Sequence, residues 1–253
     1  MPANPRSREN ALLAPELTLP PPFTLVTLRE VGDAFAHATS VAAEMGAGTL
    51  VYVGRFDLAE FAVVLEPEQP LALARGAFIA GMAALADTLT AHAQPETSVA
   101  IEWPDALSIN RGLVGGGRLG WPRGAQESET PPWLVFGAMV RIVSMSGVEP
   151  GLHPFSTALE EEGFTDVLAS QLVESFARNL MVALDLWQEQ GFAAIAREYL
   201  RRLPVEKGVR RELGETGDLL IRCVGKDEAE RKVLRPLLAQ PSWLDPALRG
   251  PRL

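Results

Sequence analysis

The sequence is poor in the residues that bind metals and form cross-links. It has one cysteine, Cys223, and three histidines in 253 residues. A single thiol excludes an internal disulfide and a zinc site built on several thiolates. His37, His92 and His153 are spread along the chain, so we expect no metal site. So little cysteine fits a reducing compartment, and we expect a cytoplasmic protein.

Positive charge is also scarce. Lysine and arginine total 23 against 32 acidic residues, which gives a formal net charge of −9. A nucleic-acid partner is not expected, because such surfaces are basic. The first ten residues lack the apolar segment of a signal peptide, and the longest apolar helical run, residues 71–86, is shorter than a membrane span. We therefore expect no membrane partner.

The remaining composition is that of a globular protein, with 47% hydrophobic and 22% charged residues. The length suits one large domain with a small appendage. Residues 1–22 are rich in proline, so we expect an extended N-terminal arm. We expect the main domain over residues 23–203 and a small C-terminal appendage of strand and helix over residues 204–253.

Apolar periodicity predicts an α/β (α+β) fold, a mostly antiparallel mixed sheet packed against helices. Glycine and proline mark the ends of several of the predicted elements. Strands are predicted at residues 23–28, 49–53, 60–65, 99–102, 107–109, 133–144 and 218–224, and helices at 33–45, 70–93, 166–190, 192–203 and 228–238.

Residues 99–122 form the stretch where a site is expected first. An apolar strand stops at Glu102-Trp103-Pro104, because proline cannot donate to a strand ladder. A turn at residues 110–112 leads to the glycine cluster 115–117. Glycines allow a ligand or another chain to approach the backbone closely. A carboxylate, a large aromatic side chain and bare backbone therefore converge at one strand end.

This stretch resembles the signature of the biotin/lipoate protein ligase family, which is Lys-Trp-Pro-Asn-Asp, a turn, and Gly-Arg-Lys-Leu-Ala-Gly. Residues 102–106 read Glu-Trp-Pro-Asp-Ala, and residues 110–115 read Asn-Arg-Gly-Leu-Val-Gly. Residues 38–43, Ala-Thr-Ser-Val-Ala-Ala, stand where the family has Ser-Thr-Asn-Asp-Glu-Ala. The resemblance spans residues 24–203 and implies the ligase catalytic-domain fold, similar to class II synthetases, without the family's DNA-binding domain.

The resemblance implies a reaction in two steps. An acid such as biotin or lipoate attacks ATP to give an acyl-adenylate, and a lysine of a carrier protein then takes the acyl group. Such a site needs cations, because negative charge accumulates at the phosphate and the carboxylate. Here Glu102 and Gly112 occupy the places of the two signature lysines. The adenylate-binding loop is reduced to a short connection whose one cation is Arg55.

These departures have a large expected cost. Two unit charges in contact are worth about 4 kcal/mol at an effective dielectric constant of about 20. Each loss of about 1.4 kcal/mol slows a reaction tenfold. We therefore expect ordinary ATP-dependent ligation to be absent or severely weakened. No cofactor is certain, since biotin, lipoate and ATP enter only through the resemblance.

Each candidate residue has a functional and a structural interpretation. The hydroxyls either bind a ureido or amide group or have a structural role, as a helix cap or within the helix. The tryptophan either walls a ring-binding slot or belongs to the core. The glycines either receive a ligand or form a tight strand crossing. The charged groups either bind ligand or are solvated at the surface, as we also expect of Asp105. The candidates are Thr39, Ser40, Arg55, Glu102, Trp103, Pro104, Gly115, Gly116 and Arg118.

Three functions remain open. The first is a divergent ligase-fold protein with a degenerate active site that binds a small carboxylate or acyl ligand. The second is an active acyl or cofactor transferase in which Arg55, Arg118 and Arg123 replace the lost lysines. The third is a non-catalytic interaction protein that forms a homodimer through its sheet.

Overall fold

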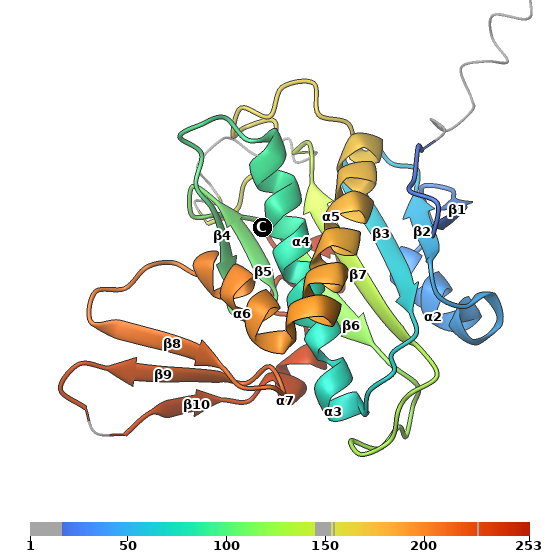
Figure 1. The fold of residues 1–253 in the computed structure, drawn as a ribbon. Helices are drawn as coiled ribbons and strands as arrows, with labels where there is room; N and C mark the ends of the chain where they lie inside the picture. The colour runs from blue at the N-terminus through green and yellow to red at the C-terminus, as the bar shows by residue number, and fades with distance from the viewer. Residues whose placement is uncertain (1–16, 145–152, 154, 227) are drawn as a thin grey trace, which may run out of the picture.

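The computed structural model describes residues 17–144, 153, 155–226 and 228–253 (Figure 1). Most of the predicted N-terminal arm lies outside the described residues. The predicted boundaries at residues 22 and 203 remain predictions.

A mixed sheet of seven strands forms the centre of the molecule. Its first two strands are parallel and every other neighbouring pair is antiparallel, which confirms the predicted fold class. Full pairing of β3 with β7 places two apolar eight-residue strands in the middle of the sheet. In spatial order the strands are β1 (Thr24–Leu28), β2 (Thr49–Val53), β3 (Leu58–Leu65), β7 (Leu134–Arg141), β6 (Gly112–Gly120), β5 (Ala106–Ile109) and β4 (Val99–Glu102).

Helices cover both faces of this sheet. Helices α4 (Gly76–His92), α5 (Ala169–Gln190) and α6 (Phe192–Arg201) lie on one face (Figure 1), and α2 (Ala34–Met45) packs on the other. Under α5 the rings of Phe61, Phe136 and Phe176 form the centre of the core, with neighbouring ring centroids 4.6 and 5.6 Å apart. Alternate residues of the central strands therefore belong to two separate apolar layers, one on each face of the sheet.

The helix predicted over residues 70–93 is two helices, because α3 (Leu71–Ala74) is separated from α4 at Arg75. Together Leu71–His92 is long and apolar enough to cross a membrane by length and composition, so the predicted shortness of this run is wrong. Of its apolar window, 83% is buried inside the protein. Such burial inside the protein is typical of a core helix.

The C-terminal part contains elements that the sequence pattern did not predict. Strands β8 (Val209–Leu213), β9 (Leu219–Cys223) and β10 (Glu230–Lys232) form a small antiparallel sheet, and only β9 was predicted. The predicted helix at 228–238 is wrong over its first half. Arg231 binds the Asp218 carboxylate from the strand β10, and the short helix α7 (Leu234–Leu238) begins where Asp218 accepts the N–H of Leu234.

The last residues return to the main sheet. Strands β11 (Leu244–Asp245) and β12 (Gly250–Pro251) pair with each other, and the guanidinium of Arg141 on β7 donates to the carbonyl oxygen of Pro251 at 2.7 Å. Just before β11, the side chain of Trp243 is fully buried against Leu58, Ala106 and Met139. The tail thereby covers part of the sheet face that α2 leaves uncovered.

We predict that Gly81→Ala destabilises the protein by about 1–3 kcal/mol, because overpacking a filled core has that cost. A Cβ atom at Gly81 of α4 would lie 2.4 Å from the Phe136 ring. At an open helix position the same change would stabilise by about 1 kcal/mol. Urea unfolding measures the difference, and an increase in stability would contradict the tight contact between α4 and the sheet.

Candidate functional site

Charged residues gather on the sheet face that carries α2. Glu60 on β3 and Arg118 on β6 point to this face, and Asp33 caps the first turn of α2 through the N–H of Ala36 at 2.8 Å. The connection between β2 and β3 adds Arg55 and its neighbour Asp57. We call this group, Asp33, Arg55, Asp57, Glu60 and Arg118, the charged cluster.

Glu60 is the buried member of the cluster. Only 2% of the residue is exposed, and its carboxylate accepts the N–H of Ala34 at 2.9 Å. Burial raises the pKa of this carboxyl, while the Ala34 N–H favours the ionised form. Glu60 thereby joins the start of α2 to the central strand of the sheet.

Arg118 is held between an aromatic ring and the acids. Its guanidinium carbon lies 4.1 Å from the centroid of the Phe35 ring, and it donates to Asp33 at 3.1 Å. Burial lowers the pKa of Arg118, and the charges of Asp33 and Glu60 oppose that shift. Gly120 and Gly137 make room for the ring, since a Cβ at either would lie within 2.8 Å of it.

Arg55 is neutralised within its own connection, residues 54–57. It donates to both carboxylate oxygens of Asp57, at 3.0 and 2.7 Å, and lies 3.9 Å from Glu60. These hydrogen bonds lower the pKa of Asp57. The charged cluster thus has three carboxylates for two guanidinium groups, so it carries no free positive charge.

Thr39 and Ser40 lie inside α2. The hydroxyl of Thr39 donates to the carbonyl oxygen of Phe35 at 2.8 Å, and that of Ser40 donates to the carbonyl oxygen of His37 at 2.7 Å. These are helix-interior bonds to the preceding turn. In this structure both hydroxyls have the structural role that was weighed against ligand binding.

The glycines at 115–117 lie within the strand β6, which was not among the predicted strands. A Cβ at Gly115 would lie 1.9 Å from the carbonyl oxygen of Met139, and one at Gly116 would lie 2.4 Å from the Trp243 ring. The Trp243 indole N–H donates to the carbonyl oxygen of Gly117 at 2.9 Å. The tight-crossing interpretation therefore describes Gly115, and the protein's own tryptophan covers Gly116.

Trp103 and Pro104 belong to the other side of the sheet. Trp103 packs against the core under α4 and α5, and its indole nitrogen has no hydrogen-bond partner among the described residues. The carbonyl oxygen of Pro104 accepts the Tyr199 hydroxyl at 2.7 Å. The structure does not bring these two residues together with Thr39 and Arg118.

The two acids of this stretch differ in their surroundings. Glu102 is exposed at the end of β4 and accepts the Ser108 hydroxyl at 3.3 Å. Asp105 was expected at the surface, yet only 2% of it is exposed. Its carboxylate accepts the Ser242 N–H at 2.7 Å and the Ser242 hydroxyl at 2.6 Å, while burial raises its pKa. Asp105 therefore anchors the C-terminal tail.

The structure adds residues to the candidate site that the sequence pattern did not single out. Asp33, Phe35 and Glu60 contact or surround Arg118. One signal was available, since Glu60 is the only charged residue in the apolar strand β3. In the part of the chain that the structure describes, no group of three or more His, Cys, Asp or Glu side chains is arranged to hold a metal ion.

A family model of the biotin/lipoate A/B protein ligases matches residues 19–201, which is most of the chain. The chain belongs to this family. A search of curated proteins found no match. Among solved structures, a biotin protein ligase-like protein of unknown function from Silicibacter sp. TM1040 is 30% identical, with a TM-score of 0.75 over 89% of this chain and 100% of that one.

True biotin protein ligases share the fold at lower identity. The Aquifex aeolicus enzyme, in complex with biotin and ATP, is 15% identical, with a TM-score of 0.59 over 83% of this chain and 99% of that one. The Leishmania major enzyme, in complex with biotin, is 16% identical, with a TM-score of 0.53 over 84% and 98%. At such identities the likeness concerns the architecture alone.

Within this biotin/lipoate ligase fold, the position that the resemblance matches to the second signature lysine lies close against Thr157. Gly112 stands there, and a Cβ at Gly112 would lie 2.6 Å from the Thr157 methyl group. The Thr157 segment is fixed over β6, because Leu113 donates to the carbonyl oxygen of Phe155 and accepts the N–H of Thr157. A side chain at position 112 would therefore require the Thr157 segment to shift.

We predict that Glu60→Gln stabilises the protein relative to the wild type by on the order of 1 kcal/mol near neutral pH, since the amide oxygen still accepts the Ala34 N–H and no charge is buried. The folded pKa of Glu60 is raised above its ordinary value of 4.5. The stability that protonated Glu60 contributes to the wild type is therefore fully present below that value and is lost as the pH rises through the folded pKa.

Urea unfolding of both proteins across the acidic and neutral range measures this difference. The advantage of Glu60→Gln should vanish at low pH and grow as the pH rises. Glu96→Gln removes an exposed carboxylate and should show no such trend. A constant difference at every pH would contradict the buried, ionised state of Glu60.

Proposed function

We propose that this ligase-fold protein binds a small carboxylate or acyl ligand at the charged cluster and does not carry out ordinary ATP-dependent biotin or lipoate ligation. The observation that carries the proposal is the setting of Arg118. Its side chain is 14% exposed, while that of its partner Asp33 is 48% exposed. A buried guanidinium is thus paired with a carboxylate at the water boundary.

Such a pair suits the exchange of one carboxylate for another. Arginine binds carboxylates through two parallel N–H donors, whereas Asp33 takes one such bond from Arg118. A ligand carboxylate that replaces Asp33 would gain a partner already positioned on the Phe35 ring. Asp33 would then turn to water, since its half-exposed side chain remains at the start of α2.

The same charges oppose the adenylation step. A nucleotide would bring several negative charges to a cluster that already holds three carboxylates and two guanidinium groups. One unmatched contact between like charges costs about 4 kcal/mol at an effective dielectric constant of about 20. Each 1.4 kcal/mol of barrier is about a tenfold change in rate. The exposed carboxylate of Glu102 and the filled space at Gly112 add to this opposition.

We predict that octanoate, lipoate or biotin binds the full chain in a calorimetric titration and that Arg118→Met weakens binding about tenfold, since a charge-assisted bond contributes about 1.5–3 kcal/mol. Asp33→Asn should strengthen binding, because it removes the competing carboxylate while asparagine still caps α2. Arg197→Met, which removes an exposed arginine on α6, is the matched control. Lack of binding by all three acids, or equal binding by Arg118→Met, would reject the proposal.

We predict no ATP–pyrophosphate exchange above the blank with any of these acids. The reason is the lack of unpaired positive charge at the cluster, and the measurement uses labelled pyrophosphate with the wild-type chain. Exchange that Arg55→Met and Arg118→Met abolish would instead establish the alternative, an active transferase with rearranged cations.

A further inference from the structure

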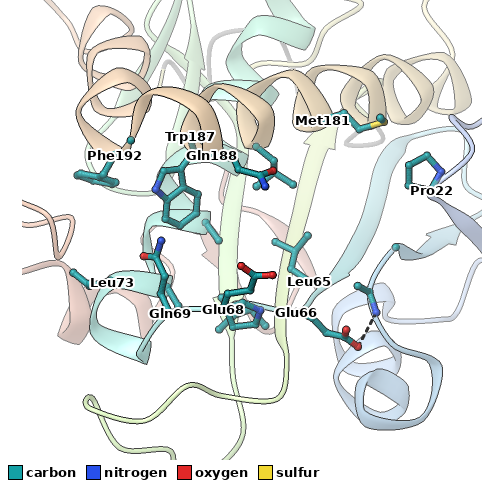
Figure 2. Close-up of a pocket in the computed structure, with 18 of the residues that line it drawn as sticks. Pro22, Leu65, Glu66, Glu68, Gln69, Leu73, Met181, Trp187, Gln188 and Phe192 are labelled. Carbon is teal, nitrogen blue, oxygen red and sulfur yellow. Dashed lines mark hydrogen bonds between the residues drawn. The ribbon is translucent and has the colours of Figure 1, made fainter.

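A cleft of about 690 Å³ lies on the opposite face of the sheet, away from the charged cluster. Figure 2 shows α5 along one wall and residues 65–69, between β3 and α3, along the other. Pro22 lies at one end and Phe192 at the other (Figure 2). The volume falls in the range of small-molecule sites.

The interior of the cleft is apolar. Leu65, Ala77, Leu134 and Leu184 line it, and the Trp187 ring projects into it from α5. Trp187 is fixed by its neighbours, because its ring centroid lies 6.4 Å from that of Phe192 at an interplanar angle of 70°. Gly76 gives the indole its place, since a Cβ there would lie 2.8 Å from the ring. The tryptophan is therefore a rigid surface for a ligand.

Every charged residue that lines the cleft is acidic. Glu66, Glu68 and Glu215 line it, and no lysine, arginine or histidine among the described residues does. The Glu66 carboxylate accepts the N–H of Ala47 at 3.2 Å. Glu68 forms no hydrogen bond or ion pair with any residue that the structure describes, and its carboxylate points toward α5 (Figure 2). The cleft thus combines an apolar interior with uncompensated negative charge.

Polar groups face each other across the opening. Figure 2 shows Glu68 and Gln69 on one wall directed toward Trp187 and Gln188 on the other. An ammonium group between them would meet a carboxylate, amide oxygens and the face or edge of an indole. A carboxylate attracts this cation by charge, and an aromatic face attracts it through its quadrupole. A primary ammonium also uses the amide acceptors, which a quaternary ammonium does not.

We propose that this cleft binds a small organic amine, with its ammonium group between Glu68 and Trp187 and an aromatic or branched aliphatic body over Leu65 and Leu184. This site is separate from the charged cluster. It lies at the Leu65 end of β3 and on the α5 face, whereas the connection with Arg55 joins the other end of the strand. Its ligand has the opposite charge to the one proposed for Arg118.

The test titrates the full chain with three probes of similar shape by calorimetry: 2-phenylethylammonium, 2-phenylethanol and 3-phenylpropanoate. The ammonium should bind about fivefold or more tightly than the alcohol, as charge and cation–π attraction require. The carboxylate is titrated into Arg118→Met, which weakens the proposed carboxylate site, and there it should bind least. Glu68→Gln should reduce binding of the ammonium about fivefold toward that of the alcohol. Glu96→Gln makes the same change at an exposed residue outside the cleft and should leave binding unchanged.

Three results would overturn the proposal. They are no saturable binding of the ammonium at millimolar concentration, equal affinity for the ammonium and the alcohol, and equal effects of Glu68→Gln and Glu96→Gln. Arg118→Met should retain binding of the ammonium, which separates this site from the carboxylate site.

Discussion

The hydrogen bond from the Ala34 N–H to the buried Glu60 carboxylate is the contact on which the α2 face depends. It fixes the start of a helix to the middle of the sheet, and that helix start carries Asp33 and Phe35. Arg118 then lies on the Phe35 ring and against Asp33. A buried carboxylate is unfavourable by itself, so its partners on both elements are required for the arrangement. The electrostatic character of the face follows from this one connection.

Membership of the biotin/lipoate ligase family fixes the architecture and leaves the chemistry open. In this chain the places that the resemblance gives to cations hold an exposed acid, Glu102, and a glycine under Thr157. The arginines that remain near the cluster already have acidic partners. Substitutions at these places leave the fold intact, because apolar alternation in the strands, and not the site, stabilises the sheet.

The sequence predicted the main fold well because long apolar strands and helices carry their own periodicity. Both β2 and β7 and the helix α5 were recognisable for that reason. The failures depend on contacts distant in sequence. The buried carboxylate of Asp105 is bound by Ser242, and Gly116 lies under Trp243. The strand β10 forms by pairing with β9. The charged cluster was predicted in part. Arg55 and Arg118 were predicted as site residues, whereas Asp33 and Glu60 are recognised as their partners only in three dimensions.

The position of Trp243 in the sequence bears on the order in which the sheet and its cover are synthesised. The matched family region ends at residue 201, and the tryptophan that covers Gly116 lies 42 positions later, since 243 − 201 = 42. During synthesis from the N-terminus, the sheet is complete as a sequence before its last cover has left the ribosome. The apolar patch formed by Leu58, Ala106 and Met139 can therefore be covered by Trp243 only after the chain has been synthesised past residue 243.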